Sequence, residues 1–189
     1  RALSAKAFPH NFTLMNCSES IICVQRYPSP CGELLLGSTG DSLCLCDWTG
    51  PVARHERIMR RIAISCRGRV VDSSSQVIDR AVGQLDEYFS GRRQLFSFPL
   101  RLIGTDFQQR VSLSLLEIPS GSTVSYLQLA SMLGCPGAVR AVANANGANP
   151  ISIIVPCHRV IGSDGRLTGY GGTIPVKHRL LTLESSIIH

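Results

Sequence analysis

"SYLQLASMLGCPGAVRAVANANGA", residues 125–148, decides how the second half of the chain folds. Ser125 and Gln128 have the spacing of a capping box, and the helix that they open should stop at Gly134. Pro136 is suited to the first turn of a second helix, which continues through the alanine-rich residues. Two short helices joined by a tight glycine-containing turn are typical of a helix-turn-helix, so we expect one here.

The second of these helices has an unusual surface for a DNA reader. Its side chains are small, and Arg140 carries the only charge. A helix that reads the major groove usually carries several long hydrogen-bond donors, whereas small residues with one arginine suit a shape-based approach in the minor groove. The alternative is that the alanines are good helix formers packed in the interior.

Another helix is expected before this pair. Thr105 and Gln108 repeat the capping-box spacing, and Pro119 and Gly121 end the helical pattern. Its apolar face consists of Phe107, Val111 and Leu115.

The first half of the chain reads as a sheet followed by a helix. Between Ile21 and Trp48, the apolar pieces "IICVQRY", "ELLLGST" and "SLCLCDW" are separated by turn compositions, which predicts a small antiparallel sheet. In "SQVIDRAVGQLDEYFSG", Ser75 is the candidate cap and Gly91 the candidate stop of a helix that packs on this sheet. The helical spacing is that of Ile78, Val82, Leu85 and Phe89.

Together these elements predict an α/β (α+β) protein of two lobes. We expect an N-terminal lobe of small sheet and helix over residues 21–98, and a C-terminal winged helix-turn-helix lobe over residues 99–189. An extended connector with Pro99 joins them near residues 92–104. Residues 1–20 show no periodicity and form a poorly defined extension.

The composition is that of a globular protein with a basic balance. Hydrophobic residues make up 44% and charged residues 17%, and the formal net charge is +6, which favours a polyanionic partner such as nucleic acid. The densest basic run, residues 54–69, is interpreted as a solvated helix face or loop, with a phosphate-binding patch as the alternative.

Membrane and secretion signals are not recognised in the sequence. No apolar run approaches the roughly 20 residues that span a bilayer, and the N-terminus lacks the pattern of a signal peptide. We therefore expect no membrane partner and a location in the cytoplasm or nucleoid, or in the nucleus if the source is eukaryotic.

The chain contains 8 cysteines, which fits free thiols in a reducing compartment better than a disulfide framework. Cys44 and Cys46 should point to the same face of a strand, but no second pair stands at zinc-ribbon spacing. A structural zinc is the alternative to small buried hydrophobes, and we predict no metal.

Cys157 stands out as a candidate nucleophile. In "IIVPCHRVIG", residues 153–162, it follows an apolar run that should be a strand, and Pro156 cannot donate to a sheet ladder. The imidazole of His158 can take a thiol proton, although neighbours on an extended chain point to opposite faces and need a bridging water or a bend. The alternative is a buried, inert cysteine beside a structural histidine.

A longer pattern surrounds this thiol. "RAVANANGANPISIIVPCHRVIGSDGRLTGYGG", preceded by "GSTVSYLQLASMLG" and followed by "VKHRLLTLE", closely resembles the O6-alkylguanine-DNA alkyltransferases, also called methylated-DNA–protein-cysteine methyltransferases. The resemblance is strong over about residues 85–184 and loose over residues 21–84. It implies that the N-terminal lobe is ribonuclease-H-like.

The resemblance also implies a reaction. Cys157 would take the alkyl group from O6-alkylguanine, and from O4-alkylthymine, in DNA and become a stable S-alkylcysteine, with no cofactor and a single turnover per molecule. The implied partner is double-stranded DNA that contains alkylated guanine, bound by a monomer.

Further roles follow from the same match. His158 would deprotonate the thiol through water, and Glu184 would orient and charge that histidine. Asn149 would brace the turn before the active-site segment, and the hydroxyl of Tyr126 would donate to the leaving guanine.

The remaining matched residues would contact the substrate. Tyr170 and Gly171 lie in the loop that covers the base, and the carbonyl of Val160 would read the exocyclic amine. Arg140 would fill the gap left by the extruded nucleotide, with Val139 beside it as a second contact.

Some positions depart from the family pattern. Ser112 stands where many relatives have tryptophan, which affects helix packing, and residues 1–50 lack recognisable zinc ligands. Arg159 is interpreted as a structural ion-pairing or hydrogen-bonding residue and not as a catalyst. The rival hypotheses are a lesion-recognition protein that does not transfer the alkyl group, and a Cys-His hydrolase.

Overall fold

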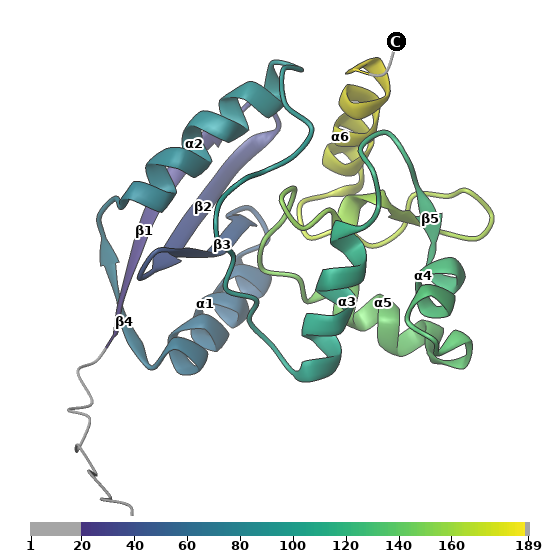
Figure 1. Ribbon diagram of the computed structural model, residues 1–189, viewed down its shortest axis with the longest axis horizontal. Coiled ribbons are helices and arrows are strands. Elements are labelled where there is room, and N and C mark those ends of the chain that lie inside the picture. The colour runs from purple at the N-terminus through teal and green to yellow at the C-terminus, as the bar shows by residue number, and fades with distance from the viewer. Residues whose placement is uncertain (1–19, 188–189) are drawn as a thin grey trace, which may run out of the picture.

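The computed structural model describes residues 20–187 and shows two lobes side by side (Figure 1). The N-terminal lobe, residues 20–89, consists of β1 (Ser20–Ser29), β2 (Gly32–Thr39), β3 (Ser42–Trp48), α1 (Val52–Cys66), β4 (Gly68–Asp72) and α2 (Gln76–Phe89). The C-terminal lobe, residues 106–187, consists of α3 (Asp106–Leu116), β5 (Val124–Ser125), α4 (Tyr126–Met132), η1 (Pro136–Ala138), α5 (Val139–Gly147), η2 (Cys157–Arg159), β6 (Val160–Ile161) and α6 (Ile174–Ile187).

The sheet of the N-terminal lobe has the order β3-β2-β1-β4. Strands β1, β2 and β3 form the antiparallel arrangement that the sequence predicts. Strand β4 pairs parallel to β1 and was not predicted, because its short sequence lies at the end of the basic run. The helix α1 makes the crossover to β4, as a parallel connection requires. The basic run is helical up to Cys66, and its last residues begin β4.

The helices α1 and α2 cover opposite faces of this sheet. Ile78 and Leu85 of α2 lie in the larger core cluster, which continues into the C-terminal lobe. Ile58 and Ile62 of α1 lie in a second cluster on the other face. Both faces of the sheet are therefore buried, which explains the nearly continuous apolar runs in β2 and β3.

The prediction that Cys44 and Cys46 share a face is wrong. Gly37 of β2 pairs with Leu45 of β3, and the next residue, Ser38, pairs with Leu43. Cys44 is therefore an extra residue in β3 that has no pairing partner in β2. A bulge of this kind breaks the alternation of side chains. Cys44 consequently lies in the core cluster of α1, and Cys46 lies in the larger cluster on the opposite face.

The predicted helix starts are confirmed in detail. Ser75 accepts a hydrogen bond from the backbone of Ile78, and Gly91 ends the segment with a φ of 75°. Complete capping boxes open α3 at Thr105 and α4 at Ser125. These side chains bind backbone donors that a helix N-terminus leaves without partners.

The segment before Cys157 is not the predicted strand. Only Ile151 pairs, as a single bridge to Cys46, and the chain then turns, with Ile153 at a φ of 71°. Cys157 begins the 3-10 helix η2. The segment is apolar because it is buried between the lobes, and burial alone does not separate a strand from a packed loop.

Backbone bonds attach this segment to the edge of the N-terminal sheet. The amide of Cys46 donates to the carbonyl of Pro150 at 3.0 Å, and the amide of Ser152 donates to the carbonyl of Cys46 at 2.6 Å. The edge strand β3 therefore fixes the position of the segment that leads to the thiol.

Two negative findings apply to residues 20–187. No helix in this range is long and apolar enough to cross a membrane. The same residues contain no group of three or more histidine, cysteine or acidic side chains placed to hold a metal ion. Cys17 lies outside the described residues.

Candidate active site

Glu184 of α6 is the centre of a buried hydrogen-bond network. Its carboxylate lies 2.7 Å from Nε2 of His158, and it accepts bonds at 2.9 Å from both Nε and an Nη of Arg159. The hydroxyl of Tyr88 donates at 2.9 Å and the amide of Gly121 at 3.1 Å. The Glu184 side chain is 0% exposed, so this set of donors replaces water around the carboxylate. The interpretation of Arg159 as an ion-pairing residue is confirmed.

The same contacts fix which nitrogen of His158 carries the proton. An ionised carboxylate only accepts hydrogen bonds, so Nε2 must donate to Glu184. In a neutral imidazole, Nδ1 is then the bare acceptor. This Nδ1 is buried and has no hydrogen-bond partner among the described residues. His158 therefore presents a proton acceptor on the side opposite Glu184.

The charges of this network are set by burial and by the pairing. Burial by itself would raise the pKa of Glu184, but the hydrogen bonds and charges of His158 and Arg159 outweigh it and hold that pKa well below its usual value. Burial lowers the pKa of His158, against the opposing hydrogen bond of Glu184. Near neutral pH the network thus consists of an ionised carboxylate and a neutral imidazole.

This arrangement predicts that acid destabilises the fold in two stages. The folded-state pKa of His158 lies below its unfolded value, so stability should begin to fall below about pH 6.5, where the unfolded chain takes up the proton first. The depressed pKa of Glu184 adds a second loss below about pH 4.3.

Urea unfolding between about pH 8 and about pH 5 measures the first stage. His158→Gln should remove its contribution and flatten the slope in this range, whereas the exposed His178→Gln should leave it unchanged. Equal slopes for all these proteins would contradict the assignment of a neutral, buried His158.

Cys157 is held in place by the asparagines that precede it. The side chain of Asn149 accepts from the amide of Ile151 at 3.0 Å and donates to the carbonyl of Val155 at 2.8 Å, which braces the buried turn. The amide of Asn146 donates to the carbonyl of Cys157 at 3.4 Å. These bonds satisfy backbone groups that the buried segment would otherwise leave unpaired.

The thiol itself is buried, with 3% of Cys157 exposed. Burial raises its pKa, and the polar side chain of Asn149 and the positive charges of Arg54 and Lys177 act against that shift. The thiol is therefore largely protonated at neutral pH, and its ionisation needs a base.

A cavity of about 410 Å³ contains several of the predicted substrate contacts, although neither Cys157 nor His158 is among its lining residues. It is lined by Arg54, Arg57, Tyr126, Ala143, Asn144, Gly147, Thr168, Gly169, Tyr170 and Gly171. The ring of Tyr170 lies 6.4 Å from that of His158, edge to face, and its hydroxyl accepts a bond from the indole of Trp48 at 3.1 Å. The structure thus brings Tyr126, Tyr170 and Gly171 to one cavity next to the buried network.

Lys177 is a buried residue of the site that sequence reasoning missed. Its ammonium donates to the carbonyl of Val160 and, at 2.8 Å, to that of Thr168. Burial lowers its pKa to about 8. It joins the segment after Cys157 to the loop that lines the cavity. The only sequence signal was a lysine inside the helical "VKHRLLTLE" pattern, where a solvated residue is the ordinary interpretation.

Asp47 and Arg54 form a second missed feature, between the lobes. The carboxylate of Asp47 is fully buried, pairs with Arg54 and accepts from the hydroxyl of Ser152 at 3.1 Å. Arg54 also donates to the carbonyl of Asn149 at 3.1 Å. The sequence signal was an acidic residue inside an apolar strand, since a buried charge requires a partner.

The predicted DNA contacts Arg140 and Val139 lie at the first turn of α5, away from the cavity lining. Arg140 is exposed, and Val139 is half-buried against the core. The alanines of this helix are partly on its surface, as a DNA-contacting face requires, and partly packed in the interior. Ala141 is exposed, Ala143 is half-buried and Ala145 is buried.

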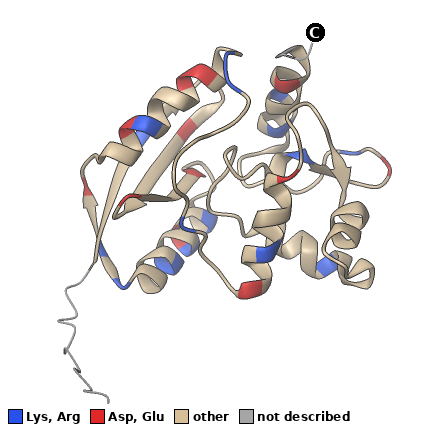
Figure 2. Cartoon of the chain, viewed as in Figure 1, with Lys and Arg blue, Asp and Glu red and all other residues tan. Residues whose placement is uncertain are grey.

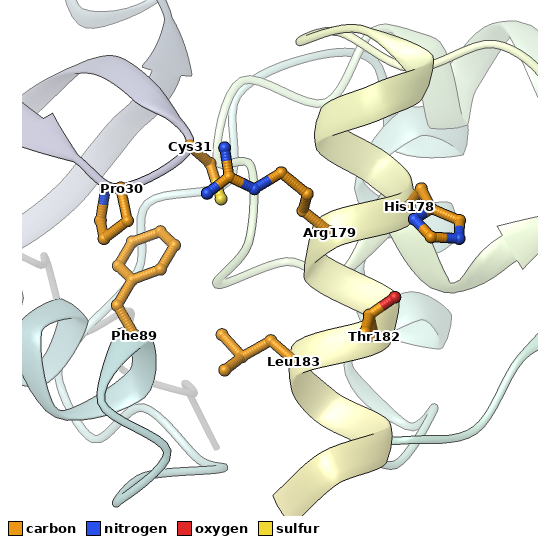
Figure 3. Close-up of a pocket in the computed structure, with 7 residues that line it drawn as sticks. All are labelled: Pro30, Cys31, Phe89, His178, Arg179, Thr182 and Leu183. Carbon is orange, nitrogen blue, oxygen red and sulfur yellow. The ribbon is translucent and has the colours of Figure 1, made fainter.

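Another cavity, of about 350 Å³, lies between the tip of the β1–β2 hairpin, α2 and α6 (Figure 3). Its lining residues are Pro30, Cys31, Phe89, His178, Arg179, Thr182 and Leu183. It contains none of the predicted site residues, so it is separate from the candidate active site.

The C-terminal lobe therefore combines a buried cysteine, a histidine–glutamate pair and the two short helices α4 and α5. Residues 22–102 match the family description "6-O-methylguanine DNA methyltransferase, ribonuclease-like domain", and residues 106–186 match the DNA binding domain of the same family. The two matches correspond to the N-terminal and C-terminal lobes of the structure.

Two relatives are named methylated-DNA–protein-cysteine methyltransferase. A methylated-DNA–protein-cysteine methyltransferase of Mycobacterium bovis is 60% identical over 106 residues, which cover 56% of this chain and 64% of that protein. The relative from Methanosarcina barkeri is 52% identical and is covered to 67%.

Solved structures align over most of the chain. The O6-methylguanine methyltransferase of Mycobacterium tuberculosis has a TM-score of 0.74 and 44% identity, over 87% of this chain and 93% of that one. A structure of the M. tuberculosis protein in complex with DNA has a TM-score of 0.75 and 43% identity, over 88% and 94% of the two chains. The chain belongs to the O6-methylguanine DNA methyltransferase family.

Proposed function

We propose that this protein repairs DNA by transferring the alkyl group from O6-alkylguanine, and from O4-alkylthymine, to Cys157. The observation that carries the proposal is the buried network of Glu184 and His158, which leaves a bare Nδ1 in the residue next to a protonated thiol. Support for the substrate comes from the relatives, which are named for methylated DNA and a protein cysteine.

In the proposed reaction, Nδ1 of His158 takes the thiol proton through a water molecule. The thiolate of Cys157 then attacks the alkyl carbon, so that a C–S bond forms while the C–O bond to guanine breaks. The electron pair leaves on guanine O6. The hydroxyl of Tyr126, which lines the cavity, supplies the proton that neutralises the leaving base.

Glu184 would act on His158 and not on the substrate. Its carboxylate stabilises the imidazolium that forms when His158 takes the proton, and its bond to Nε2 holds the ring in the tautomer that leaves Nδ1 free. Asn149 would position the segment that carries the thiol.

The cavity would receive a single extruded base. Guanine O6 is out of reach of a thiol in stacked duplex, so the nucleotide must leave the helix. Tyr170 and Gly171 would cover the flat ring, and the carbonyl of Val160, held by Lys177, would accept from the exocyclic amine. Arg140 and Val139, on the exposed start of α5, would occupy the minor groove at the vacated position.

The product explains why we propose one turnover per molecule. A thioether, unlike an acyl-enzyme, offers water no carbonyl carbon to attack, so Cys157 stays alkylated. No cofactor is required by this chemistry. We further propose that the protein acts as a monomer in the compartment that holds the DNA, organised as the lobes 21–98 and 99–189.

Stoichiometric titration tests this function. Incubation with duplex DNA that carries O6-methylguanine should add one methyl group to the peptide that contains Cys157 and should stop after one equivalent of DNA. Cys157→Ala should leave the lesion intact. An unmodified peptide with bound, intact lesion would support a recognition protein instead, and repeated turnover on a thioester would support a hydrolase.

A further inference from the structure

The helix α1 of the N-terminal lobe turns a row of arginines toward the C-terminal lobe. Arg54, Arg57 and Arg61 have the spacing i, i+3 and i+7, which places them on one side of the helix. Figure 2 shows basic residues along this helix. Arg54, Arg57 and Arg61 each line a cavity that also contains Ala143, Asn144 and Gly147 of α5. The row therefore faces the C-terminal half of α5, the helix that we propose binds DNA.

The outer members of this row already have protein partners. Arg54 pairs with Asp47 and donates to the carbonyl of Asn149. Arg61 donates to the carbonyl of Ala148. The last carbonyls of a helix lack partners within it, and guanidinium groups satisfy them here. These contacts account for Arg54 and Arg61 as residues that join the lobes.

Arg57, between them, has no such role. It is exposed and makes no hydrogen bond or ion pair with residues 20–187. It lies at the rim that both cavities share, beside the exposed residues Asn144 and Gly147. A Cβ added at Gly147 would meet no atom within 4 Å, so the space in front of this rim is open.

We propose that Arg57 binds a backbone phosphate next to the extruded nucleotide, so that the N-terminal lobe forms part of the DNA interface. The inference rests on the proposed function. A nucleotide in the cavity remains joined to the strand on both sides, and its phosphates must cross the cavity rim. A free guanidinium beside small residues offers charge and room for such a phosphate. This replaces the earlier interpretation of the whole basic run as a solvated face.

Salt dependence of the transfer rate distinguishes this contact from general charge. Each neutralised phosphate contributes about 0.9 to the slope of log affinity against log salt on duplex DNA. With subsaturating lesion DNA, Arg57→Gln should lower the transfer rate by roughly tenfold at low salt. It should also reduce the magnitude of this slope by about 0.9, which is the contribution of one phosphate contact. Arg57→Lys should retain most of the slope, because a phosphate accepts a point charge.

Arg60→Gln is the matched control, since Arg60 is exposed on the same helix but lines neither cavity. The free base O6-methylguanine, which has no phosphate, should react with Arg57→Gln and with the unmutated protein at the same rate. Equal losses for Arg57→Gln and Arg60→Gln on DNA would overturn the inference, and so would an equal loss on DNA and free base. Failure of the unmutated protein to transfer from DNA would instead overturn the proposed function.

Discussion

Replacing Glu184 by glutamine should nearly abolish alkyl transfer and lower the free energy of unfolding by about 3–5 kcal/mol. The amide is close in size to the carboxylate, so the effect comes from charge. Arg159 is 5% exposed and would keep its positive charge without a counterion. Removing one partner of a buried ion pair leaves an uncompensated charge in a medium that solvates it poorly.

The loss of transfer has a separate cause. Glutamine can accept from Nε2 of His158, but it cannot stabilise the imidazolium that the proposed reaction forms. Its amide can also donate, which allows the opposite tautomer of His158 and so removes the bare Nδ1. General-base assistance contributes about 10²–10⁴ to a rate, and most of that factor should disappear.

Urea unfolding and single-turnover transfer measure the two effects of Glu184→Gln. Glu117→Gln serves as the control, because Glu117 is exposed and makes no side-chain hydrogen bond or ion pair among the described residues. Transfer should be measured without urea, at a temperature where circular dichroism shows that the variant is folded. A folded variant with the unmutated transfer rate would show that Glu184 is only structural.

Local signals were sufficient for the elements that depend on local contacts. The caps at Ser75, Thr105 and Ser125 were predictable because each bond joins residues three apart in the chain. The same reasoning failed for β4, whose partner β1 lies far away in the sequence. Its residues are partly exposed and carry no alternating pattern.

The site shows the same division between local and distant contacts. The resemblance supplied Cys157, His158 and Glu184, and the structure joins the last two by a hydrogen bond across 26 positions of the chain. Asp47 and Arg54 belong to the loosely matched half, and their partners Ser152 and Asn149 lie in the other lobe. No spacing rule within one segment predicts such a pairing.

The contacts between lobes give the N-terminal lobe a physical role in the site. The segment 150–156 has few backbone partners of its own, and it is held by the edge strand β3, by Asp47 and by Asn149. A buried loop with unpaired backbone groups would be costly, so the sheet edge and these side chains replace the strand pairing that the sequence predicted.

His158→Gln should reduce the transfer rate by about 10²–10⁴ near neutral pH, and the deficit should shrink as pH rises. In the unmutated protein, the lowered pKa of His158 keeps Nδ1 free to accept a proton at neutral pH, so the rate should be nearly flat there. In the variant, the thiol must lose its proton to solvent. Burial raises the pKa of Cys157, so the thiolate fraction of the variant should grow by about tenfold per pH unit below that pKa.

Single-turnover rates between about pH 6.5 and about pH 9 measure this convergence, with the exposed His178→Gln as the matched control. A constant ratio between variant and unmutated protein across this range would mean that His158 only positions the thiol. An unchanged rate at neutral pH would mean that another group removes the proton. Convergence at high pH has one physical explanation in this site: the imidazole supplies a base that hydroxide can replace, and the thiolate then reacts from the same position.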